Sequence, residues 1–77
     1  MNSLADATPH RAMNVVSIGG ARTFRRRLLE MGIVPGTEIR VVNVAPLGCP
    51  IEFEARKTRL SVRRVEAQHI IVETSAT

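Results

Sequence analysis

Cys49, His10 and His69 are the side chains of this sequence whose types could supply a nucleophile and a base. Nucleophilic catalysis requires the two groups within hydrogen-bond reach and a third group that orients the base. The three residues are far apart in the sequence, and no recognisable motif surrounds either histidine. Glu52 and Glu54 alternate with apolar residues and so point to one solvated face of a strand. The sequence therefore predicts a protein that is not an enzyme.

The same cysteine and histidines are ligand types that zinc or ferrous iron accepts. Metal sites are recognised in a sequence by paired ligands at short spacings, and Cys49, His69 and His10 show no such pairing. We expect no certain cofactor, and Cys49 and His69 are weak candidates for binding Fe(II) or Zn(II). Cys49 is otherwise interpreted as a loop residue in a reducing cytoplasm. Two chains could still share a soft metal, or form a disulfide, through Cys49 if its loop faces a dimer axis.

The composition is that of a small basic domain. The chain has 77 residues, which predicts a single domain (residues 1–77) with a small core that self-association or a partner subunit would stabilise. Its net charge of +4 raises a nucleic-acid hypothesis, but two Phe and no Trp or Tyr offer no platform on which bases could stack. We favour a solvated basic surface and expect no nucleic acid as partner. Since neither a signal peptide nor an apolar run of roughly 18 residues occurs, we expect a cytoplasmic protein.

One segment, residues 21–31, has helical periodicity. Its apolar residues recur at spacings of three, four and three and so share one face of a helix. They are Ala21, Phe24, Leu28 and Met31. Gly32 is the expected left-handed stop of this helix. Leu29 falls on the other side, among Arg22, Arg25 and Arg26, and is either a harmless exposed leucine or a contact for another protein.

The remaining ordered segments alternate between apolar and polar residues, as half-buried strands do. They are residues 11–18, 38–44, 51–54, 60–62 and 70–73, and a frayed tail follows at 74–77. In the central hairpin the apolar residues must share one face, which fixes the register. That register pairs Phe53 with Leu60, Ile51 with Val62 and Glu54 with Arg59, and it leaves residues 55–58 as the loop.

Two glycine–proline corners flank the strand expected at 38–44. The first is Pro35-Gly36, and the second is the segment Pro46-Leu47-Gly48-Cys49-Pro50. Proline presets φ and glycine accepts φ values that other residues avoid, so both segments fix where the chain turns. About five short strands with one helix after the first strand predict a mainly β fold. We expect a small barrel, because closure would remove the exposed edges of the sheet.

Five segments occur in an order and spacing that are together specific. They are residues 4–6 (LAD), 15–20 (VVSIGG), 27–37 (RLLEMGIVPGT), 45–50 (APLGCP) and 60–67 (LSVRRVEA). With these segments the chain resembles the FeoA family, the small cytoplasmic components of bacterial ferrous-iron uptake systems, over nearly its whole length.

This resemblance implies an SH3-like barrel and a non-enzymatic accessory or regulatory protein. The implied partner is FeoB, a polytopic membrane GTPase-permease, so that contact with the membrane is expected only through the partner. The docking surface that we expect combines Arg22, Arg25, Arg26 and Leu29 of the helix with Pro46, Leu47 and Cys49 of the second corner. The alternative is that the helix only plugs the barrel and its arginines keep the protein soluble.

Three positions depart from the pattern of the family. Cys49 replaces the usual Asp, while His10 and the pair Arg56-Lys57 stand where turn glycines are common. Either turn could therefore follow a different backbone path. Two other functions stay open: a small basic barrel that binds nucleic acid, and a transition-metal-binding or metal-sensing module. The same barrel type occurs at the C-terminus of iron-dependent repressors, although this chain has no room for a helix-turn-helix.

Overall fold

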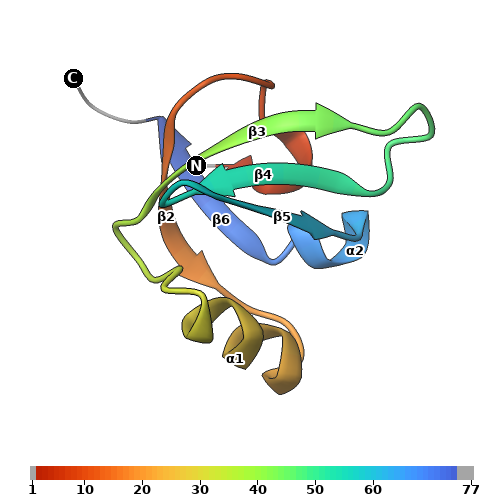
Figure 1. Ribbon diagram of the computed structural model, residues 1–77. Coiled ribbons are helices and arrows are strands. Elements are labelled where there is room, and N and C mark those ends of the chain that lie inside the picture. Colours follow the sequence, from red (N-terminus) through yellow and green to blue (C-terminus); the bar gives the residue numbers. More distant parts are fainter. Residues whose placement is uncertain (1, 75–77) are drawn as a thin grey trace.

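The structure, a computed structural model, describes residues 2–74 of the chain. Its strands form one antiparallel sheet in the order β1-β6-β2-β3-β4-β5 (Figure 1). The strands are β1 (Asn2–Ser3), β2 (Met13–Ile18), β3 (Glu38–Val44), β4 (Ile51–Ala55), β5 (Thr58–Val62) and β6 (Ile70–Thr74). The helices are the 3-10 turn η1 (Leu4–Asp6), α1 (Arg22–Glu30) and the single turn α2 (Arg64–Ala67). The predicted mainly β fold is confirmed.

The sheet is not closed by hydrogen bonds within the described residues. β1 and β5 are its two ends, and they do not pair with each other. We expected closure because it would hide the edges of the sheet, and hydrogen bonds do not provide it. Phe24 and Leu28 of α1 are buried in the same core as the strands, so this helix covers part of the apolar surface of the sheet. No helix within residues 2–74 is long and apolar enough to cross a membrane.

The core is built from aliphatic residues and the two phenylalanines. In β4 every second residue is buried, and the first three residues of β2 and of β6 follow the same alternation, which is the two-residue period of a strand with one covered face. Leu4 of η1 and Ile33, which follows α1, are fully buried members of the same core. No polar or charged residue is buried among residues 2–74, so the core contains no group that needs an internal partner.

The β4–β5 hairpin has the predicted register. Phe53 lies opposite Leu60 and Ile51 opposite Val62, and Arg59 Nε is 4.0 Å from Glu54 Oε2 across the strands. The loop is shorter than predicted, because Ala55 pairs with Thr58 and only two residues remain to turn. These two, Arg56 and Lys57, have φ of 53° and 65°, as a type I′ turn requires. Two side chains that carry a Cβ thus hold the left-handed conformation that glycine usually adopts.

The structure also tests the predictions for the second strand, the turn at His10 and the C-terminal tail. The expected irregularity in β2 is a register shift between Val15 and Ser17. His10 has a φ of 69°, so this turn position is left-handed, and its N–H donates to Val41 O at 2.7 Å. Thr74 is not part of a frayed tail, because it pairs with Met13 as the last residue of β6. Residues 75–77, the rest of the predicted tail, lie outside the described residues.

The end of α1 is fixed by a Schellman motif. Gly32, with φ of 83°, donates its N–H to Leu29 O at 2.9 Å, and the next residue, Ile33, donates to Leu28 O at 2.9 Å. Ile33 and Leu28 are both fully buried, which is the apolar contact that accompanies this motif. The rotation of α1 about its axis is therefore set at its last turn, with Leu28 toward the core and Leu29 toward solvent.

Candidate functional site

The outer face of α1 places the predicted docking residues in solvent. Arg22, Arg25 and Arg26 are exposed, and none of them has an ion-pair partner within residues 2–74. Leu29 is 61 % exposed among them. This face combines unpaired positive charge with an uncovered leucine, and arginine is one of the residue types that dominate contact energy in protein interfaces.

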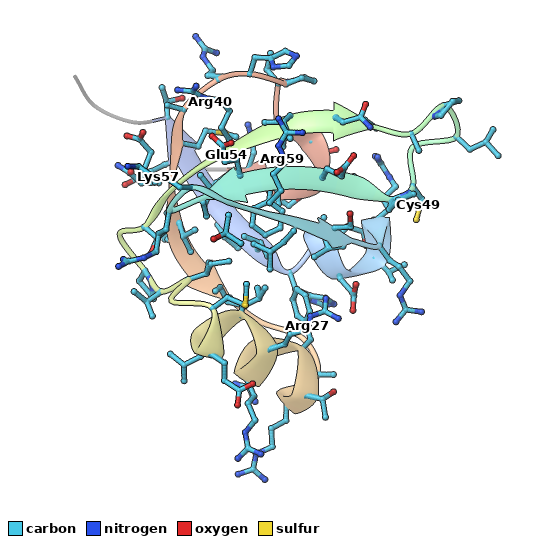
Figure 2. All side chains as sticks on the ribbon, in the orientation of Figure 1. Arg27, Arg40, Cys49, Glu54, Lys57 and Arg59 are labelled. Carbon is cyan, nitrogen blue, oxygen red and sulfur yellow. The ribbon has the colours of Figure 1, made fainter. Side chains whose placement is uncertain are left out.

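The β3–β4 loop, residues 45–50, holds the other predicted docking residues. It is closed by Ala45 N–H donating to Pro50 O at 3.1 Å and Gly48 N–H donating to Ala45 O at 2.7 Å. Pro46 and Leu47 are exposed, and Leu47, with 96 % of its surface free, is the most exposed large apolar residue described. The thiol of Cys49 also points to solvent (Figure 2).

The structure does not bring these two sets of residues together. In Figure 1 the outer face of α1 lies at one end of the molecule, and the β3–β4 loop extends from the other side, with α2 between them. A single partner that contacts both must therefore also cover the surface around α2.

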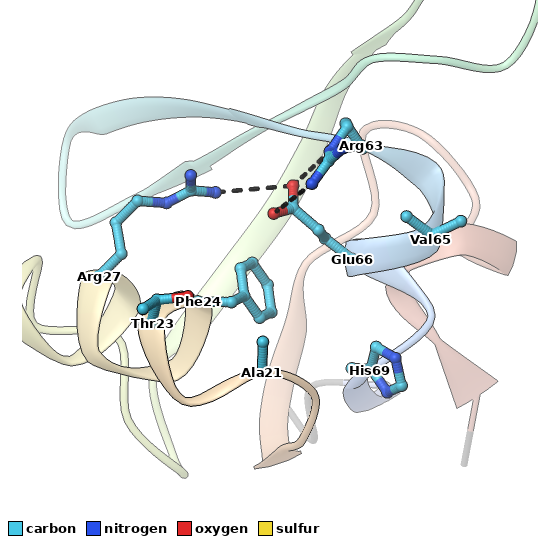
Figure 3. Close-up of a pocket in the computed structure, with 8 residues that line it drawn as sticks. All are labelled: Ala21, Thr23, Phe24, Arg27, Arg63, Val65, Glu66 and His69. Carbon is cyan, nitrogen blue, oxygen red and sulfur yellow. Dashed lines mark hydrogen bonds and ion pairs between the residues drawn. The ribbon is translucent and has the colours of Figure 1, made fainter.

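A groove of about 500 Å³ lies between the first turns of α1 and α2 (Figure 3). Ala21, Thr23 and Phe24 line it on the side of α1, and Val65 and Glu66 line it on the side of α2. The ring of Phe24 is almost wholly buried, whereas Val65 is 60 % exposed. The buried ring of Phe24 thus forms an apolar floor of the groove, and the exposed side chain of Val65 forms an apolar wall.

Glu66 organises one end of the groove (Figure 3). Its Oε1 accepts the backbone N–H of Arg63 at 2.9 Å, which caps the start of α2. Arg27 Nη2 lies 3.6 Å from Oε1 of Glu66, and Arg63 Nη2 lies 3.7 Å from its Oε2. One carboxylate therefore lies between two guanidinium groups that come from opposite sides of the groove.

The hydrogen bond from the Arg63 backbone lowers the pKa of Glu66 below its ordinary value of 4.5. Burial raises this pKa by less than the hydrogen bond lowers it, and the positive charges of Arg27 and Arg63 lower the pKa further. Arg27 is itself held in place, because its guanidinium carbon lies 5.5 Å from the centre of the Phe24 ring. Glu66 is consequently ionised at neutral pH and fixed by both backbone and charge.

His69 lines the groove next to Ala21, beside the chain reversal at Gly19 and Gly20. Gly19 donates its N–H to the His69 carbonyl at 2.8 Å, and the imidazole packs over Gly20. A Cβ on Gly20 would lie 3.1 Å from the ring, and the φ of 88° at this residue also disfavours a side chain. Glycine is therefore needed at this position for both the turn and the approach of the histidine.

The predicted metal candidates are not assembled into a centre. Within residues 2–74 no three side chains of His, Cys, Asp or Glu lie close enough to hold a metal ion together. Cys49 stands in the β3–β4 loop, whereas His69 lies beside Gly20 at the groove. Neither residue therefore belongs to a group of three such side chains in the described part of the chain.

The sequence interpretation missed the groove and the ion pairs across it. Arg27 and Glu66 belong to separate segments, and their approach depends on how α1 and α2 pack, which no local pattern encodes. One local signal was available, because Glu66 follows Arg63 at the spacing of a capping glutamate. That pattern marks the start of α2, although it does not reveal the partner on α1.

Comparison with known proteins identifies relatives of this chain. The model of a family described as the FeoA domain matches residues 2–74. A protein of Porphyromonas gingivalis, named as a fusion of Fe(2+) transport protein A and Fe(2+) transporter FeoB, is 42 % identical over 59 residues. The match covers 77 % of this chain but only 7 % of that much longer relative.

Solved structures agree with this result. The FeoA protein of Chlorobium tepidum superposes with a TM-score of 0.91 at 35 % identity, over 96 % of this chain and 70 % of that one. The FeoA of Stenotrophomonas maltophilia, described as an SH3 domain protein and solved with zinc, superposes with a TM-score of 0.81 at 30 % identity, over 95 % and 91 % of the two chains. The predicted SH3-like fold is confirmed, and this chain belongs to the FeoA family.

Proposed function

We propose that this chain is a non-enzymatic accessory protein of bacterial ferrous-iron uptake that docks on the GTPase-permease FeoB at the cytoplasmic face of the membrane. The observation that carries the proposal is the P. gingivalis relative, whose name joins transport protein A and transporter FeoB in a single polypeptide. Fusion gives two domains a high effective concentration for each other, which is useful where separate chains must associate to work. Membership in the FeoA family supports the same role.

The docking surface in this proposal contains the outer face of α1 and the β3–β4 loop. Leu29 and Leu47 are exposed apolar residues that a partner would cover. The unpaired arginines of α1 would contact acidic groups of the partner, since they make no ion pair within residues 2–74. Because α2 lies between the two, one partner surface would extend over all three elements.

A binding experiment with FeoB of the same organism in phosphatidylcholine nanodiscs tests this function. We expect the wild-type chain to bind, and Leu29→Glu to fold normally but bind at least about tenfold more weakly, because a charge replaces an interface anchor. Val34→Glu is the matched control, since Val34 is also exposed but lies outside the proposed surface. Absence of wild-type binding would contradict the function, whereas full binding by Leu29→Glu would exclude only the face of α1.

A second candidate function is weak binding of Zn(II) or Fe(II). It is supported by the zinc complex of the S. maltophilia relative. Cys49 and His69 are the ligands that this chain offers, each alone, so that a site would need a second chain or solvent to complete it. Zinc titration by calorimetry on the wild type, Cys49→Ser and His69→Ala tests this candidate. Identical heats for all three proteins would exclude both residues as ligands.

A further inference from the structure

We infer that the groove between α1 and α2 receives a segment of FeoB in which an acidic side chain stands next to an apolar one. This inference rests on the proposed function and names the chemistry that this chain would recognise.

The size and lining of the groove fit a short stretch of polypeptide. Its volume of about 500 Å³ lies within the range of roughly 300–1,000 Å³ that is typical of ligand sites. An apolar side chain placed between Ala21 and Val65 would rest on the Phe24 ring and cover the exposed Val65. Since Phe24 is already buried, this floor would not have to rearrange on binding.

One end of the groove has a net positive charge and can bind a second carboxylate. Arg27 and Arg63 carry two positive charges around the single negative charge of Glu66, which leaves that end with a net charge of +1. Both ion-pair distances, 3.6 and 3.7 Å, are longer than hydrogen bonds. Each guanidinium has five N–H donors, and the two side chains are 51 % and 73 % exposed. Both arginines can therefore contact an incoming carboxylate without releasing Glu66.

Glu66 and Arg27 are also held in position before a partner arrives. Glu66 is tied to the backbone of Arg63, and the Arg27 guanidinium lies over Phe24. A site whose side chains are already ordered loses less conformational entropy on binding. The fixed end of the groove would orient the acidic residue, and the apolar wall would receive its neighbour.

The groove is continuous with the proposed docking surface. It opens between α1 and α2, and α2 borders the β3–β4 loop, where a Cβ added to Gly48 would lie 3.7 Å from Nη1 of Arg64. A FeoB segment in the groove would thus connect the two separated parts of the docking surface.

Two conservative substitutions in the groove, with matched controls elsewhere, test the inference. Arg63→Gln removes one charge, and Val65→Ser removes the apolar wall. Arg40→Gln and Val34→Ser make the same changes at exposed positions away from the groove, and Figure 2 shows Arg40 far from Arg27. Affinity for FeoB in phosphatidylcholine nanodiscs is measured at low and at high salt, and thermal unfolding verifies that each variant is folded.

We expect Arg63→Gln and Val65→Ser each to weaken binding by about five- to tenfold, with both controls at the wild-type affinity. Arg63→Gln should also make the affinity less sensitive to salt. If the wild type binds and the two groove variants bind equally well, the inference is overturned while the proposed function stands. If the groove variants instead lose binding to protein-free nanodiscs or to a second copy of the chain, the occupant is not FeoB and the inference is likewise overturned. Failure of the wild type to bind FeoB would contradict the proposed function itself.

Discussion

Glu66 makes both a local contact within its own helical turn and a long-range contact with α1. Its carboxylate caps α2 through the Arg63 N–H and at the same time lies between two guanidinium groups. A four-residue helix cannot be stable by itself, because forming the first helical turn is unfavourable. The side chain of Glu66 therefore ties α2 both to its N-cap residue, Arg63, and to α1.

Replacing Glu66 by Gln should lower stability at neutral pH by about 1 kcal/mol, since a charged acceptor of a backbone N–H becomes a neutral one. The loss should depend on pH in a defined direction. The pKa of Glu66 in the folded chain lies below its ordinary value of 4.5. Its stabilisation is thus complete above that value and disappears as pH falls through the folded pKa. Urea unfolding from about pH 3 to about pH 7 measures this dependence.

Glu30→Gln is the matched control for this experiment. Glu30 is an exposed glutamate at the end of α1 and makes no ion pair within residues 2–74. Its substitution should leave stability within about 0.5 kcal/mol of the wild type. The wild type and Glu66→Gln should converge in stability at the acidic end of the range. A constant difference between them at every pH would show that the charge of Glu66 is not what stabilises the fold.

Single residues of the site could be predicted only where their exposure follows from periodicity. Leu29 and the arginines beside it lie in solvent as the helical period indicated, because period and face are local properties. Arg27 was not recognised, because its contact with Glu66 depends on how α1 and α2 lie relative to each other.

At the scale of one helix, α1 allows a direct test of its orientation. Leu28→Ala should destabilise the chain by about 2–5 kcal/mol, because Leu28 is fully buried and its removal leaves a cavity. Leu29→Ala, the same change one residue further on, should cost less than about 0.5 kcal/mol, because Leu29 is mostly exposed. Chemical unfolding of both variants gives the comparison. Equal losses would contradict the orientation fixed by the Schellman motif.

The turn of the β4–β5 hairpin holds a residue in a strained backbone conformation, and a substitution can remove this strain. Lys57 holds a φ of 65° in a two-residue turn, a conformation that is costly for a residue with a Cβ. Lys57→Gly should stabilise the chain by about 0.5–1 kcal/mol, or roughly 2–8 °C in the midpoint of thermal unfolding. Lys57→Ala removes the same charge but keeps the Cβ, so it should give no gain. If both variants gain equally, relief of charge repulsion is the cause and the backbone explanation is wrong.

Elements with strong alternation could be predicted almost to the residue, and the shortest ones could not. β3 has the predicted bounds, and the hairpin has the predicted register, because a shift by one residue would turn Phe53 out of the core. β1 has only two residues, which is too short for any period to be detected. The loop at Arg56-Lys57 was predicted too long, because neither residue type signals a left-handed turn.

Closure of the sheet is a property of the whole molecule that strand patterns do not determine. Counting turns and strands indicated a small β domain, and that class is confirmed. Whether the two edge strands, β1 and β5, meet depends on how far the sheet curls, which no strand pattern encodes. A helix between strands is visible in the sequence, whereas the part of the core that it covers is not.

The net charge of the chain is +4, and its basic residues differ in whether they form ion pairs. Arg27, Arg59, Arg63 and Arg64 each pair with an acidic residue. The other basic residues make no ion pair within residues 2–74, and three of them lie together on the outer face of α1. Free charges gathered on one face attract an acidic partner and raise the rate of encounter, whereas a uniform surface charge chiefly favours solubility. The two explanations of the basic composition differ in what they predict for the rate of association.

Two triple variants of equal net charge separate these explanations. The first replaces Arg22, Arg25 and Arg26 by Gln, and the second replaces Arg11, Arg40 and Arg59 by Gln. Each loses three positive charges, so that +4 becomes +1 in both. At low salt the first variant should associate with FeoB about tenfold more slowly than the second, with smaller differences in the dissociation rate.

Stopped-flow measurements of association over a range of salt concentrations test this prediction. The association rates of the two variants should converge at high salt, where charges are screened. Equal association rates at every salt concentration would mean that the arginines of α1 act only through the total charge, and the outer face of α1 would then not be where FeoB is attracted.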